Sequence, residues 1–251
     1  DREYASEILY EEQVKEALKV PRFVGRRMMV KRQLGGFVKN DGVDDTSRAH
    51  ADATYVNALT CMEAILSQRP FLLGNRPTIA DFGMLGPMFR HFGQDPTPSE
   101  IMRQKGPHVF AWVAQMWGLS HSDLDGELIE TADAPLVAFL REVCETTLAQ
   151  HSQNAAAWSQ GADRYALEVQ DARYASVPTS RYRVWCLEAL RREWAELPRD
   201  AKASLETTLT SSEASVLWDE TSFKPSDYDA QNAAPFNRAI NVFDGGVPGK
   251  P

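Results

Sequence analysis

The sequence of 251 residues contains only three cysteines, and no two of them form a C-x-x-C pair. So sparse and widely spaced a set indicates free thiols in a reducing compartment. No apolar run reaches the length needed to cross a bilayer, and the first residues, Asp1-Arg2-Glu3, do not resemble a signal peptide. These absences predict a cytoplasmic protein that is not embedded in a membrane.

An excess of basic residues is also lacking. The formal net charge is -8, from 27 basic and 35 acidic residues, which argues against nucleic acid or an anionic membrane as the main partner. A basic cluster at residues 26–32 is too short to change this. We interpret it as a solvated face or a subunit contact, with binding of a carboxylate or phosphate as the alternative.

The composition is that of a folded protein. Hydrophobic residues make up 43% of the chain and charged residues 25%, which suits one large domain or two small ones and excludes a disordered chain. The first residue is not Met, and a helical pattern starts at once. We therefore expect a chain that is a fragment of a longer protein or that has lost upstream residues.

Helical periodicity dominates the sequence. The expected helices span about residues 3–38, 47–68, 78–92, 107–117, 134–159 and 179–197. Pro21 should break the first of them, and Pro198 can open a further one. A small hairpin is expected near residues 165–177, and the segment from residue 222 should be irregular. About eight helices with almost no strand predict an all-α bundle.

The most informative stretch is residues 71–82, FLLGNRPTIADF. Thr78 is placed to cap a helix by accepting from the amide of Asp81, and the Asp81 carboxylate can reach back to the amide of Thr78. This capping box puts an acid at the positive end of the helix dipole. The helix behind it is apolar nearly all round, so we expect it to be the buried central helix of the bundle.

This string, followed by its apolar helix, resembles the C-terminal domain of glutathione transferases. The continuation GPHVFAWV at residues 106–113 is similar to the family's next helix, where a Trp packs inside. The resemblance is specific over about residues 70–117, extends back to residue 3, and is weak beyond residue 133. It implies an all-α, glutathione-transferase C-terminal-like helical domain over residues 1–132. Residues 133–251 would be a long helical extension with an irregular tail, packed on it.

The thioredoxin-like domain that holds glutathione in this family has no counterpart in these 251 residues. The resemblance therefore implies the helical, electrophile-site half of a glutathione-transferase-like enzyme that acts with an upstream thioredoxin-like domain. Glutathione would be its co-substrate, and no catalytic residue is assigned in this chain. The predicted contacts of an apolar electrophile are Tyr10, Val14, Met28 and Met29. The family's long interface helix, matched by the helices before residue 70, makes a homodimer possible.

The alternative hypothesis is a non-catalytic interaction module, since domains of this kind also act as docking units. Its partner would be a protein instead of an electrophile, so whether the protein is an enzyme stays open. Met28 and Met29 also suit a plain helix–helix contact.

Other chemistry finds little support in the sequence. We interpret Cys61, Cys144 and Cys186 as small buried hydrophobes rather than nucleophiles. No two of the five histidines have the spacing of a helical metal site, so no metal is expected. Residues 179–185, TSRYRVW, are expected to start a capped, packed helix, with stacking or anion binding as the alternative.

Overall fold

The computed structural model describes residues 1–231; residues 232–251 of the expected extension lie outside this range. The first part contains α1 (Arg2–Leu9), α2 (Lys15–Leu18), α3 (Arg22–Lys31), α4 (Arg48–Leu66), α5 (Ile79–Pro87), α6 (Pro96–Lys105) and α7 (Pro107–Trp117). The second contains α8 (Ala134–Val143), α9 (Ala149–Ser159), β1 (Arg164–Val169), β2 (Ala172–Pro178), α10 (Arg181–Glu196) and α11 (Arg199–Thr208). The predicted all-α class is confirmed, with one antiparallel hairpin in the described chain.

Short irregular helical turns continue or follow several of these helices. Four are π-helical: η1 (Tyr10–Val14), η2 (Arg32–Val38), η3 (Met88–Phe92) and η5 (Cys144–Leu148). Two are 3₁₀: η4 (His121–Leu124) and η6 (Ser212–Leu217). The predicted helix over residues 134–159 is therefore α8, η5 and α9 in line.

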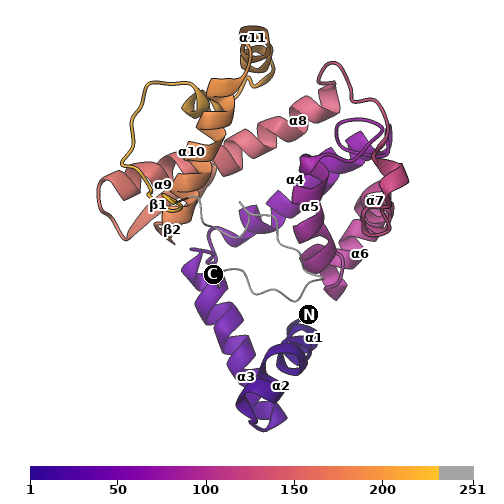
Figure 1. Cartoon of the computed structure of the whole chain (residues 1–251). Helices are drawn as coiled ribbons and strands as arrows, with labels where there is room; N and C mark the ends of the chain where they lie inside the picture. Colours follow the sequence, from indigo (N-terminus) through magenta and orange to yellow (C-terminus); the bar gives the residue numbers. More distant parts are fainter. Residues whose placement is uncertain (232–251) are drawn as a thin grey trace, which may run out of the picture.

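Residues 1–38 form a helical hairpin that projects from the rest of the molecule (Figure 1). Pro21 breaks the helix as predicted: it lies just before α3 with a φ of −55°, while Lys19 adopts a left-handed φ of +47°. Tyr10, Val14 and Met29 are buried against one another and hold the arms together. The hairpin thus has a small core of its own.

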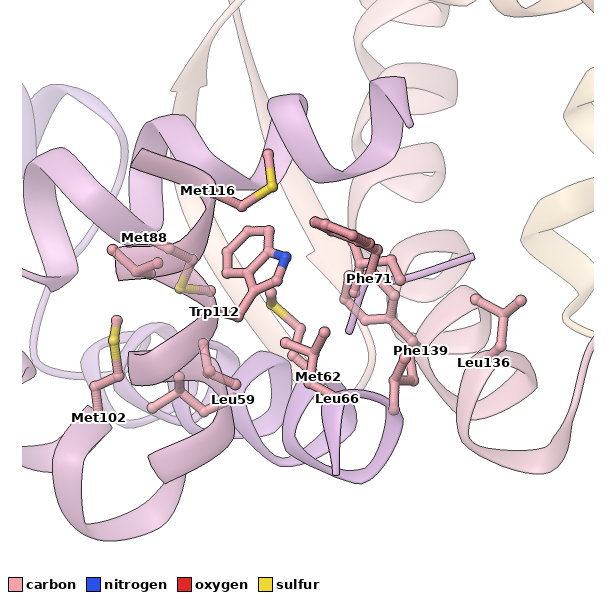
Figure 2. Close-up of a cluster of buried hydrophobic side chains, with 14 residues drawn as sticks. Leu59, Met62, Leu66, Phe71, Met88, Met102, Trp112, Met116, Leu136 and Phe139 are labelled. Carbon is pink, nitrogen blue, oxygen red and sulfur yellow. The ribbon is translucent and has the colours of Figure 1, made fainter. Parts of the chain in front are cut away.

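The main core is centred on Trp112, around which methionine and leucine side chains from several helices gather (Figure 2). α4 packs against α6, α7 and α8, and it supplies Leu59 and Met62 to this core. Leu136 and Phe139 of α8 belong to the same cluster. The first bundle and the extension therefore share a continuous core across residues 132 and 133.

The extension has a second core of its own, in which α9 packs against α10. A smaller cluster lies between α9 and the β-hairpin of β1 and β2, which covers α9. The hairpin is also tied to the first part of the chain. His50 at the start of α4 bonds the Tyr174 hydroxyl through Nδ1 at 2.8 Å and Gln170 Oε1 through Nε2 at 2.9 Å. Arg164 of β1 donates to the side chain and the carbonyl of Asn40.

The prediction that the helix behind the capping box is buried all round is wrong. Only Asp81 is buried within α5, while Ile79 is 89% and Phe82 is 53% exposed. The reason is one-sided cover: α7 packs on α5, whereas the helices of residues 1–38 pack mainly on one another. One apolar face of α5 is left open to solvent.

The close packing of the Leu-Leu-Gly turn explains why residue 74 is a glycine. Residues 71–75 run beside residues 127–129, with Asn75 N donating to Glu127 O at 2.8 Å and Ile129 N to Leu73 O at 2.9 Å. Gly74 has a φ of +146°, and a Cβ there would lie 2.4 Å from Glu127 O. Only glycine fits this crossing without moving one of the two strands of backbone.

We expect Gly74→Ala to lower the free energy of unfolding by roughly 2 kcal/mol, because it adds both backbone strain and a clash. Equilibrium urea unfolding measures the loss. The matched control is Gly83→Ala in α5, where a Cβ meets nothing within 4 Å. It should stabilise the chain by about 0.5–1 kcal/mol. Equal midpoints for the two variants would contradict the close crossing.

Candidate functional site

The buried carboxylate of Asp81 joins three segments of the first bundle. Its Oδ2 accepts from the Thr78 amide at 2.9 Å and the Thr78 hydroxyl at 3.0 Å, within the predicted capping box. Its Oδ1 accepts from the Leu72 amide at 2.9 Å and from Trp112 Nε1 at 3.2 Å. Asp81 is 0% exposed, so the predicted cap is also an internal cross-link between the turn, α5 and α7.

A second polar contact continues this network into the extension. Arg69 donates from Nε to Leu72 O at 3.0 Å, and its guanidinium pairs with the carboxylate of Asp133. Asp133 in turn caps α8 by accepting from Leu136 N at 3.1 Å. The hydrogen bond from Arg69 holds the pKa of the Asp133 carboxyl below its usual range. The turn before α5 is thus fixed on one side by the buried carboxylate of Asp81 and on the other by the partly buried pair of Arg69 and Asp133.

The structure brings three of the four predicted electrophile contacts together, but in a core. Tyr10 is 7%, Val14 1% and Met29 6% exposed, and a Cβ on Gly25 would lie 2.4 Å from the Tyr10 ring. Met28 lies apart from them and is 42% exposed. Met29 therefore makes the plain helix–helix contact that was the alternative interpretation of the two methionines.

Two open clefts adjoin η3, and the sequence patterns did not single out either. One, of about 700 Å³, lies between α4, η3 and α6 and is largely apolar, with Tyr55 stacked on Phe92 at 4.1 Å. The other, of about 660 Å³, lies between α1, η2 and η3. Its apolar lining residues are Tyr4, Ile8, Leu9 and Phe37, and its basic ones are Arg32, Arg90 and His91. The sequence showed the periodic apolar positions that line these clefts. It did not show which helices would face each other.

The cysteines lack the environment of a nucleophile. Burial raises the pKa of the Cys144 thiol to about 11 and also raises the pKa of Cys61 and Cys186. Cys144 lies in the second core and Cys61 packs against the first. A thiol with a raised pKa carries little thiolate at neutral pH, which matches their interpretation as small hydrophobes.

Within residues 1–231 no group of three or more His, Cys, Asp or Glu side chains is arranged to hold a metal ion. None of the helices in the described range combines the length and apolarity that a membrane span requires.

The side chain of His151 is largely buried. Desolvation by burial, helped by the charge of Arg183, lowers its pKa from 6.5 to about 4.

The capped helix α5, the Leu-Leu-Gly turn and the inward Trp112 are the features that carried the resemblance to the glutathione transferase C-terminal domain. The comparison with protein families agrees: residues 45–115 match the family described as "Glutathione S-transferase, C-terminal domain". This range contains Thr78, Asp81 and Trp112. The chain thus contains a glutathione transferase C-terminal-like domain, as the resemblance implied. Neither the curated proteins nor the solved structures gave a match to this chain.

We expect Asp81→Ala to cost about 3 kcal/mol in the free energy of unfolding. A lost cap alone costs about 1 kcal/mol, and the buried Leu72 amide and Trp112 indole each lose their acceptor as well. Urea unfolding of the purified variant measures it.

Asp123→Ala is the matched control, because Asp123 closes a second capping box on Ser120 in an exposed turn. There the loss should be no more than about 1 kcal/mol. If both variants lost the same amount, the bonds to Leu72 and Trp112 would contribute nothing.

The state of His151 predicts an acid-dependent loss of stability. Its pKa is lowered on folding, so between pH 6.5 and about 4 the unfolded chain binds a proton that the folded chain does not. The free energy of unfolding should therefore fall as the pH falls through this window. His151→Gln should flatten the decline measured by urea unfolding at several pH values, and His121→Gln, at an exposed site, should not. Parallel profiles for wild type and His151→Gln would contradict the neutral, buried state.

Proposed function

We propose that this chain is the helical, electrophile-site half of a glutathione-transferase-like enzyme and acts with an upstream thioredoxin-like domain that holds glutathione. The observation that carries the proposal is the cleft of about 660 Å³ between α1 and η3. Tyr4, Ile8 and Phe37 line it and are partly exposed. Its size is within the range of small-molecule sites, and aromatic and aliphatic walls suit an apolar electrophile.

The chemistry assigned to the chain is binding and orientation. Its own thiols have raised pKa values, so the nucleophile in this proposal is the thiolate of glutathione, held by the other domain. Placing an apolar electrophile beside a thiolate supplies much of the rate of such a reaction. Met28 is exposed but does not line this cleft, so the proposed electrophile contacts are Tyr4, Ile8 and Phe37. The buried Tyr10, Val14 and Met29 would act by supporting the first helix arm.

The exposed apolar face of α5 supports the proposal that another domain packs on it. Ile79 and Phe82 are exposed there, and a Cβ on Gly83 or Gly86 would meet nothing within 4 Å. A helix that is apolar all round is normally covered. In this proposal the thioredoxin-like domain covers it. A cytoplasmic location and a homodimer belong to the same proposal.

The alternative proposal is a non-catalytic interaction module, in which a separate protein covers the face of α5. The same exposed Ile79 and Phe82 support it. The two proposals differ in whether the protein in its natural length binds glutathione.

The test uses this chain and the natural full-length protein side by side. For this chain alone we expect no conjugation of an aromatic electrophile by glutathione at neutral pH and no calorimetric binding of glutathione. An apolar aromatic probe should bind it in the cleft, about tenfold more weakly in Ile8→Asp, because a carboxylate there must be desolvated. Phe23→Asp is the control, since Phe23 is 75% exposed outside the cleft.

For the full-length protein we expect turnover with glutathione, and loss of turnover in Phe82→Asp with unchanged helicity of this domain. Glutathione binding with turnover by this chain alone would place the tripeptide site here and contradict the proposal. A full-length protein that never binds glutathione, but forms a stable complex that Phe82→Asp breaks, would favour the interaction module.

A further inference from the structure

Four polar residues lie on α9, the β-hairpin and the start of α10, which pack on one another. They are His151 of α9, Tyr165 of β1, Thr179 after β2 and Arg183 in the first turn of α10. Thr179 and Arg183 belong to the segment TSRYRVW, whose function is not accounted for by the glutathione-transferase-like part of the chain. The cluster lies in the extension, outside the family match at residues 45–115.

Backbone contacts fix how these residues lie. Thr179 N donates to Asp163 O at 2.9 Å, and Tyr165 pairs with Val177 across the hairpin. Residues two apart in a strand share a face, so Tyr165, Val177 and Thr179 lie on one face of the hairpin. That face packs toward α9, because Val177 is 1% exposed in a cluster with Ala149.

α9 is tied to the start of α10 by Asn154, which is fully buried. Its side chain accepts from Ser180 N at 2.8 Å and donates to Ser180 O at 2.9 Å. His151 lies one turn before Asn154 and Arg183 one turn after Ser180, so the two side chains come from adjoining turns of packed helices. The charge of Arg183 accordingly acts on the pKa of both His151 and Tyr165.

None of these polar groups has a partner within the described chain. His151 Nδ1, the Tyr165 hydroxyl and the Thr179 hydroxyl are buried without a hydrogen bond. For residues 1–231, no hydrogen bond or ion pair involves the half-buried Arg183 guanidinium either. Its neighbour Arg181, by contrast, donates to the carbonyls of Ser226 and Asp227. Buried polar groups are almost always paired, so three buried unpaired atoms close to an unpaired, half-buried guanidinium indicate a bound species.

We propose that His151, Tyr165, Thr179 and Arg183 form a binding site for a small carboxylate anion. A guanidinium donates two parallel bonds to a carboxylate, and the two hydroxyls donate to its remaining lone pairs. His151 is neutral at physiological pH and donates from Nδ1 in the matching tautomer. The site then carries one positive charge, which a monovalent carboxylate balances and a dianion does not.

The test is an NMR titration of the whole chain with sodium acetate, following the ring resonances of His151, with sodium chloride at equal ionic strength as reference. We expect a saturable shift with acetate and none with chloride. Tyr165→Phe removes a hydroxyl that has no protein partner, so it should leave urea stability unchanged and weaken acetate binding by about tenfold. Arg183→Met should abolish the saturable shift.

Arg192→Met, at an exposed position on the same helix, is the matched control and should bind acetate like the wild type. Equal shifts with acetate and chloride, or unchanged acetate affinity in Tyr165→Phe, would show that ordinary hydration satisfies these groups and would overturn the proposal. Tighter binding of sulfate than of acetate would overturn the assignment of a monovalent anion. If Arg183→Met does not fold, Tyr165→Phe alone decides.

Discussion

A carboxylate buried without exposure must be surrounded by donors, and the first bundle is arranged around meeting that requirement at Asp81. The Thr78 amide donates to it within the local capping box, whereas the Leu72 amide and the Trp112 indole come from a preceding turn and a distant helix and donate to it only when the bundle is assembled. Because an unpaired buried charge is far costlier than a weak cap, this one residue couples the three segments. The pairing of Arg69 with Asp133 extends the coupling to the start of α8.

The same bundle is complete on one side only. Trp112 and the side chains around it in Figure 2 are enclosed, while α5 presents Ile79 and Phe82 to solvent. The contrast separates two kinds of apolar residue in one short helix: those that the described chain covers, and those that are exposed to solvent. The interaction-module proposal rests on this second kind, whereas the enzyme proposal rests first on the cleft between α1 and η3.

The sequence predicted most of the helices, the break at Pro21 and the capping box, because each depends on residues close together in the chain. It did not predict that Asp81 also bonds Trp112, since a donor 31 residues away is brought there only by tertiary packing. Periodicity likewise identified apolar faces correctly but not their partners. The resemblance implied that Tyr10 and Val14 form a pocket wall, although they meet Met29 in a core, and the apolar pattern of α5 predicted that this helix is enclosed.

The π-helical turn η5 separates two uses of one long helix. Before it, Leu136 and Phe139 belong to the first core; Cys144 and Leu148 within it, and Ala155 after it, belong to the second. A π turn takes in an additional residue, and each residue of an α-helix advances the side-chain direction by about 100°. Removing one residue within Cys144–Leu148 would therefore rotate α9, and everything packed on it, about the helix axis relative to the bundle. The orientation of the extension is set by the number of residues in this turn. Inserting or deleting one residue there would redirect the β-hairpin and α10 relative to the first bundle.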